Sequence, residues 1–336
     1  MKTKITYSLL AAAAACSLAN AETAYTTPVG YITHTINSVG GGEALTIIGP
    51  SLIQPSVFSG ASTASPSGST VTFSGGVPTG LDSTYVLEIT SGAKEGWWST
   101  VASSTATTVT TNDAFPGGLG SGTTVSVRKH NTLQTFFGEN NPGLIAFDGG
   151  SGDEIQIFNS DQSLTAFSYV PSDVSGEATS DWYNLSTAQI ANDQIIEPGA
   201  AVIIKTNSAS QLSFISTGEV KLTNTEVDVF PGLTLIAQPL AVGGSFNSMD
   251  LQNQLIPLNA EASNVDFDEF QIFNADQSLT AYAAADPAIF GSATMVNLSS
   301  AEDAGAVSLA EGVGAIVKRN PSISASTIIL PGTNIQ

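Results

Sequence analysis

The residues of this chain whose types and spacing could do chemistry together are carboxylates around two similar segments. Asp148 precedes the first segment, which Asp153 and Glu154 open, and Asp268 and Glu269 open the second. Ca²⁺ takes six to eight oxygen ligands from carboxylates and carbonyls on a bent backbone. The first group, with carbonyls of the glycine-rich loop inside it, is therefore a candidate calcium site, and solvated turn acids are the alternative.

Three tryptophans offer a second kind of site. Trp97 and Trp98 are adjacent, so on a strand they point to opposite faces, and one can be core while the other is presented. An exposed indole is a stacking surface for a sugar ring, and Trp182 is a further candidate. Core or interdomain packing is the more common use of such residues.

No catalytic signature is found in the sequence. It lacks a Gly-x-Ser-x-Gly elbow, a His-Glu-x-x-His motif and a phosphate-binding loop, and its two histidines, His34 and His130, are far apart. A chain with 29 acidic residues always offers carboxylate pairs of the kind that glycosidases use, so such pairs carry little weight. The sequence therefore predicts a protein without catalytic residues and without a cofactor, calcium excepted.

The element that must position the carboxylates is a repeated hairpin. Residues 153–167 and 268–282 are identical at 12 of 15 positions. Apolar residues alternate with polar ones on both sides of an Asn-x-Asp-Gln turn, which predicts a β-hairpin in each copy. Residues 197–207 and 310–320 also resemble each other, as do residues 45–52 and 233–240. The chain therefore contains an internal duplication.

The spacing of short β-branched runs between glycines and prolines predicts an all-β fold, mainly antiparallel and sandwich- or barrel-like. Few helices are expected, and the two candidates are short, at residues 181–191 and 298–306. We predict a signal peptide at 1–21, then an N-terminal β-rich region with an insertion at 22–142. The first repeat follows at 143–226 and the second at 227–336.

The predicted signal peptide has Lys2 and Lys4 before an apolar run, with Ala-Asn-Ala at its end as the cleavage site. Its removal also removes Cys16, the only cysteine, and leaves 7 basic side chains against 29 acidic ones. A net charge near −22 repels nucleic acids and anionic lipids, whereas divalent cations, basic partners and neutral glycans are permitted. The triplet at 128–130, Arg-Lys-His, is the one sizeable basic spot. It is interpreted as a strand end that discourages aggregation or as an anchor for another copy.

Several phrases resemble those of an uncharacterised family of exported bacterial proteins. They are TPVGYITHTI, LTIIGPSLIQPSVFSG, VSVRKHNTLQTFFG, DEIQIF and EPGAAVIIK, in that order along the chain. The family has a GY-type start, a basic-His-x-TL phrase ending in FG, and a PG-x-x-x-I closing phrase. It has no established activity, so the resemblance implies export and fold. Lys205 and the Thr after it stand where the closing phrase has an Arg, and the second copy, with Lys318 and Arg319, fits better.

Together these features predict a secreted, acidic protein of the cell surface or extracellular space, with the periplasm as another destination. Its expected role is structural or adhesive and non-catalytic, through self-association or binding to other surface components. A glycan-binding module is the first alternative, and a carbohydrate-active enzyme is the second. The chain is not expected to bind nucleic acid or to insert into a membrane.

Overall fold

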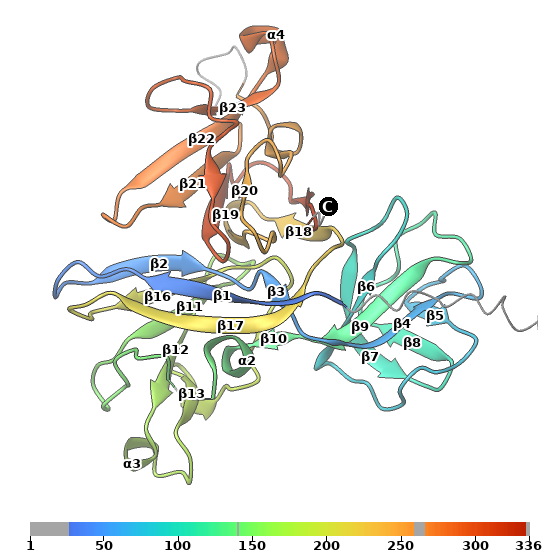
Figure 1. The fold of residues 1–336 in the computed structure, drawn as a ribbon, viewed down its shortest axis with the longest axis horizontal. Helices are drawn as coiled ribbons and strands as arrows, with labels where there is room; N and C mark the ends of the chain where they lie inside the picture. The colour runs from blue at the N-terminus through green and yellow to red at the C-terminus, as the bar shows by residue number, and fades with distance from the viewer. Residues whose placement is uncertain (1–26, 140, 259–265, 334–336) are drawn as a thin grey trace, which may run out of the picture.

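A computed structural model describes residues 27–139, 141–258 and 266–333 of the chain. Most of the regular structure in these residues consists of antiparallel β-strands, and the helical segments are short, which confirms the all-β prediction. Figure 1 shows the first repeat in blue, green and yellow, the second repeat in orange and red above it, and the insertion in cyan beside them. The predicted signal peptide at 1–21 and Cys16 lie outside the described residues.

The first repeat contains a six-stranded and a three-stranded sheet. The larger sheet has the order β14-β13-β12-β11-β16-β2, and the smaller one has the order β1-β17-β3. The strands are β1 (Val29–Ile36), β2 (Ala44–Ile48), β3 (Leu52–Ile53), β11 (Glu154–Phe158), β12 (Leu164–Val170), β13 (Asp181–Asn184), β14 (Gln189–Ile190), β16 (Val202–Thr206) and β17 (Leu212–Val220). Helix α2 (Leu133–Phe137) brings Phe136 and Phe137 into the core that these strands share.

Smaller elements complete this repeat. Strands β10 (Asn131–Thr132) and β15 (Ile195–Ile196) form a short ladder, and α3 (Ser172–Ser175) follows β12. Thr132 begins α2 with a capping box, because its hydroxyl accepts from the amide of Thr135 while the Thr135 hydroxyl accepts from the amide of Thr132. The cap fixes the point where the chain returns from the insertion into the first repeat.

The second repeat is built in the same way around a five-stranded sheet of order β19-β25-β21-β22-β23. Its elements are β18 (Thr225–Val229), β19 (Gly232–Ala237), β20 (Gly244–Ser245), η2 (Leu251–Asn253), β21 (Glu269–Phe273), β22 (Leu279–Ala285), α4 (Pro287–Phe290), β23 (Thr294–Asn297), β24 (Ser308–Leu309), β25 (Gly314–Arg319) and β26 (Ser326–Leu330). Strands β18 and β26 pair beside the sheet, as do β20 and β24. Phe246 and Phe270 are fully buried in its core.

The strand pairing shows the internal duplication directly. Strand β11 pairs with β12 and β16 as β21 pairs with β22 and β25. Strand β2 pairs with β16 as β19 pairs with β25, and β1 pairs with β17 as β18 pairs with β26. The first repeated unit therefore draws β1 and β2 from the sequence before the insertion. The predicted boundaries at 142 and 226 stay predictions.

The insertion forms a separate sheet of order β4-β9-β6-β7-β8-β5. Its strands are β4 (Ser56–Ala61), β5 (Thr70–Thr72), β6 (Tyr85–Ile89), β7 (Trp98–Ser104), β8 (Thr108–Thr111) and β9 (Thr124–Lys129). The apolar residues that alternate along these strands, such as Leu87, Val101 and Val127, are buried in a core of their own.

The two predicted helices were wrong. Residues 181–190 form β13, a turn and β14. The Asn184 side chain accepts from the amides of Ser186 and Thr187, and Ala188 has a φ of 54°, so a tight turn replaces the helix. Residues 294–301 repeat this arrangement around Asn297. None of the helices in the described part of the chain is both long and apolar enough to cross a membrane.

Candidate functional site

A cleft of about 460 Å³ lies where the insertion sheet meets the two repeats. The insertion contributes Trp98, Thr100 and Asp113 to its walls. The first repeat contributes residues 157–160, 194–198 and 200–202, and the second repeat contributes residues 227, 228, 230 and 233–235. Because three different parts of the chain line this cleft, its shape depends on how they are held together.

Trp98 is the one tryptophan among the aromatic residues that line this cleft, the others being Phe158 and Phe230. It begins β7, and its indole N–H donates to the carbonyl oxygen of Glu226 over 2.8 Å, which ties the insertion to the start of the second repeat. Its neighbour Trp97 points the other way and packs against Phe115, with ring centroids 5.0 Å apart. The alternation expected for adjacent strand residues therefore places Trp97 against the insertion core and Trp98, half-buried, at the cleft.

Three carboxylates line the same cleft, from three different parts of the chain: Asp113, Glu197 and Asp228. Partial removal of water raises the pKa of Glu197, and repulsion from Asp228 and Asp113 raises it further. Loss of solvent and repulsion from Asp113 likewise raise the pKa of Asp228. The cleft therefore favours a ligand that donates hydrogen bonds to these carboxylates.

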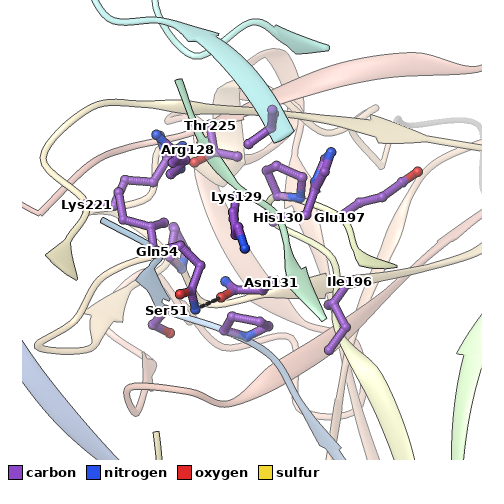
Figure 2. A pocket seen from close by; sticks show the side chains of 16 residues that line it. Ser51, Gln54, Arg128, Lys129, His130, Asn131, Ile196, Glu197, Lys221 and Thr225 are labelled. Carbon is purple, nitrogen blue, oxygen red and sulfur yellow. Dashed lines mark hydrogen bonds between the residues drawn. The ribbon is translucent and has the colours of Figure 1, made fainter. Parts of the chain in front are cut away.

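A small cavity of about 30 Å³, enough for one water molecule, adjoins the cleft and shares Glu197 with it. Figure 2 shows the side chains of Arg128, His130, Lys221 and Glu197 around it. Arg128 and Lys221 each donate to the buried carboxylate of Glu88. Burial lowers the pKa of Lys221 to about 7 and that of His130 to about 4.

The surroundings of the basic triplet at 128–130 differ from those that both sequence-based interpretations assume. Strand β9 lies inside its sheet, between β4 and β6, and Arg128 and His130 are buried. Arg128 neutralises Glu88, and the Nε2 atom of His130 lies 3.1 Å from the hydroxyl of Thr100. Only the middle residue of the triplet, Lys129, is exposed. Two of its three side chains, Arg128 and His130, therefore make contacts inside the insertion rather than facing solvent.

The predicted calcium ligands lie outside the cleft and have partners within the protein. Asp148 is exposed and accepts from the amides of Gly150 and Ser151 at 2.9 and 2.8 Å, as a loop cap does. Asp153 is buried and accepts from the amide of Ile145 and from the hydroxyl of Thr206 at 2.8 and 2.7 Å. These bonds occupy carboxylate oxygens that a metal ion would need.

In the second copy, Asp268 is fully buried and binds Arg319 through two hydrogen bonds, at 2.8 and 2.6 Å. Glu154 lies 3.8 Å from Lys205, and Glu269 lies 2.8 Å from Lys318. Among residues 27–139, 141–258 and 266–333, no group of three or more His, Cys, Asp or Glu side chains is arranged to hold a metal ion. Calcium binding stays a prediction.

Trp182, the third predicted glycan contact, is 1% exposed. Its ring packs against Phe137 and Tyr169, with centroids 5.5 and 5.4 Å away. Of the three tryptophans, Trp98 alone lines the cleft. The acidic members of the cleft were missed by sequence reasoning, because nothing local distinguishes Asp113 or Asp228 from other exposed acids. Glu197 had a signal, since it opens the EPG phrase of the duplicated segment.

The chain matches no protein-family model, no curated protein and no solved structure. The resemblance to exported bacterial proteins therefore stays a prediction, and the function is argued from the cleft.

Proposed function

We propose that this chain is an exported, non-catalytic protein of the cell surface or extracellular space with a structural or adhesive role. We further propose that its cleft binds a neutral, hydroxyl-rich ligand, a glycan. The observation that carries the second proposal is the joint position of Trp98 and three carboxylates in a cleft of about 460 Å³. A volume of this size suits one or a few sugar rings.

The chemistry of the cleft matches that of a sugar. A pyranose ring offers a face of C–H groups that stacks on an indole and a rim of hydroxyls that donate to carboxylates. Trp98 provides the aromatic surface, and Asp113, Glu197 and Asp228 provide acceptors. The hydroxyls of Thr100 and Thr234 add further polar groups to the lining. The formal charge of −20 disfavours anionic glycans, so the ligand is expected to be neutral.

Binding to an array of neutral glycans, followed by calorimetry, tests this proposal. We expect Trp98→Ala to weaken binding by about fivefold or more, because aromatic stacking contributes about 1 kcal/mol or more. Tyr31→Ala is the matched control, since Tyr31 is 73% exposed on β1 and lies outside the cleft lining. A wild-type chain that binds no glycan, or a Trp98→Ala chain that binds as well as wild type, would contradict the proposal.

One observation favours a carbohydrate-active enzyme as a second candidate. Glu197 and Asp228 both have raised pKa values and line the same cleft, and a glycosidase needs a protonated and an ionised carboxyl group. Incubation with glycans that bind, followed by assay of released reducing ends, separates the two functions. We expect no release. Release that Glu197→Gln abolishes would replace the binding proposal with the enzymatic one.

Export is proposed from the predicted signal peptide and the resemblance. Fractionation of producing cells, with mass spectrometry of the N-terminus, tests it. We expect a chain that begins at Glu22 in the medium or on the cell surface. A full-length chain in the cytoplasm would be inconsistent with this proposal, and a mature chain confined to the periplasm would restrict it.

A further inference from the structure

The two repeats meet through a pair of reciprocal glutamine contacts. Gln162, in the turn of the first hairpin, accepts from the amide of Leu233 over 2.6 Å and donates to its carbonyl oxygen over 3.1 Å. Gln277, at the same place in the second hairpin, makes the same pair of bonds with Leu45, at 2.6 and 3.3 Å. Leu45 and Leu233 are themselves counterparts in the duplicated phrase. The turn of each hairpin therefore binds a strand of the other repeat, β19 for the first hairpin and β2 for the second.

Main-chain contacts across this joint follow the same rule. The amide of Gly49 donates to the carbonyl oxygen of Gly312 over 3.1 Å, and the amide of Ala237 donates to that of Gly199 over 2.8 Å. Gly49 corresponds to Ala237 in the duplication, and Gly199 corresponds to Gly312. Two further bridges, between residues 48 and 313 and between residues 200 and 236, form another reciprocal pair.

At the centre of the joint, residues contact their own counterparts. A Cβ atom on Gly49 would lie 2.5 Å from the Cβ of Ala237, and one on Gly314 would lie 2.7 Å from the Cβ of Ala201. Contact between equivalent positions is the mark of a two-fold axis. A small apolar cluster surrounds this point and contains Ile47, Ala201, Leu235 and Ala237, with Phe158, Ile203, Phe273 and Ile316 packed against it. In Figure 1 the joint lies between β2 and the orange and red strands.

From this geometry we propose that each repeat presents a self-complementary surface whose partner is a second copy of the same surface. Within one chain the two repeats satisfy each other. Between chains, the first repeat of one molecule pairs with the second repeat of another, which gives exchanged dimers and head-to-tail oligomers. The same contacts form in both cases, so the interface itself does not disfavour exchange.

The insertion sheet keeps the pairing within one chain by fixing the linker between the repeats. Lys221 is 5% exposed and donates to Glu88 of β6, and the hydroxyl of Thr223 donates to the same carboxylate over 3.0 Å. The amide of Asn224 donates to Glu95 over 3.1 Å. Exchange of repeats between two chains therefore requires that these hydrogen bonds break.

Hydrogen exchange of the full chain tests the reciprocal contacts. We expect Gln162→Ala to speed exchange at the amide of Leu233, and Gln277→Ala to speed it at Leu45, by about tenfold each. Gln156→Ala is the matched control, because Gln156 lies on the same hairpin and its side chain donates to Glu154 within the first repeat. If either glutamine variant leaves the hydrogen exchange of its partner leucine amide unchanged, the inference is overturned.

Mixing of isotopically heavy and light full-length chains tests the partner. Both are concentrated in mild denaturant, returned to native buffer and separated by size, and the masses of the species are measured. We expect mixed dimers and oligomers in which the amides of Leu45 and Leu233 still exchange hydrogen slowly. Glu88→Gln should increase the fraction of these mixed species. Thr223→Ala is the milder release of the linker if Glu88→Gln fails to fold.

Monomers alone in every folded variant, or aggregates that lose protection at both leucines, would overturn the proposal. Loss of the Gln162 and Gln277 contacts should speed the exchange of repeats between chains. It should leave the final fraction of oligomer unchanged, because monomer and oligomer contain the same joint between repeats. A changed fraction would contradict the shared joint. Glycan binding is read separately, so failure of the cleft proposal does not affect this one.

Discussion

Two aspartates at the same position of the duplication show how one side chain serves two settings. Asp153 and Asp268 both lie buried at the start of the hairpin and both accept a main-chain amide, from Ile145 and from Ile256. The first is satisfied by neutral donors, whereas the second has Arg319 as a counter-ion. Their recurrence in sequence thus reflects a folding role within each repeat.

This difference in partners predicts unequal costs of removing the charge. Asp268→Asn should destabilise the fold by about 3–5 kcal/mol, because it leaves Arg319 buried without a counter-ion. Asp153→Asn should cost only about 1–3 kcal/mol, the loss from weakening hydrogen bonds to neutral donors. Urea unfolding measures both, with Asp161→Asn in the exposed turn as a control. Equal costs at the two buried positions would show that the ion pair adds nothing.

His34 predicts a loss of stability in acid. Burial lowers its pKa from 6.5 to about 4, so the folded state holds it neutral, stacked on Phe214. Its stabilising effect is complete above pH 6.5 and is lost as the pH falls toward 4, because the unfolded chain takes up the proton first. Between pH 7 and 4.5 this one residue should account for about 2 kcal/mol of the free energy of unfolding.

The measurement is urea unfolding of wild type and His34→Phe at both pH values. The variant keeps an aromatic ring and cannot titrate, so its loss should be smaller by that amount. Glu197 and Asp228 have raised pKa values and act in the opposite direction in both proteins, so the difference between the two proteins is the quantity to read. The same pH dependence in both proteins would mean that His34 is protonated in the fold.

Among the elements, the hairpins were predictable and the apparent helices were not. The hairpin pattern is local, since alternation and an Asn-x-Asp-Gln turn suffice to define it. Residues 181–191 carry a helix-compatible composition, but Trp182 completes the first core from a strand beside β12. Long-range packing determines the secondary structure of this segment, and its local sequence pattern does not indicate a strand.

Gly314, on β25 at the joint between the two repeats, packs too closely against its neighbours to accept a side chain. Gly314→Ala should destabilise the protein by about 1–3 kcal/mol, because the new methyl group would lie 2.6 Å from Ile47 and 2.7 Å from Ala201. Gly117→Ala is the control, since nothing lies within 4 Å of that position. Thermal unfolding compares them, and a neutral Gly314→Ala would mean that the two repeats can move apart without cost.

For the whole molecule, composition predicted an acidic surface and the repeats predicted two related units, but the cleft could not be predicted. Asp113, Glu197 and Asp228 come together only because the insertion is held against both repeats, through Glu88 and through Trp98. That packing depends on residues more than a hundred positions apart in sequence, which periodicity does not connect.

The charge of the whole molecule predicts its response to cations. We expect calcium to raise the melting temperature no more than magnesium does at matched ionic strength, because screening relieves a formal charge of −20 without a dedicated site. Thermal unfolding in calcium, magnesium and sodium chloride measures this. A rise specific to calcium, removed by Glu154→Gln together with Glu269→Gln, would instead establish the predicted metal sites.

The pairing of β1 with β17 also governs when this molecule can finish folding. His34 reaches Ser216 across a sequence separation of 182 residues, so the first sheet cannot close until the insertion and most of the first repeat have been synthesised. Contacts this distant in sequence slow folding, since a long loop must close before they form. Until then β1 is a strand without its neighbour. A chain that completes this sheet late remains loosely structured for longer, and the export proposed above would make use of that delay, because a folded protein does not fit a narrow secretion channel.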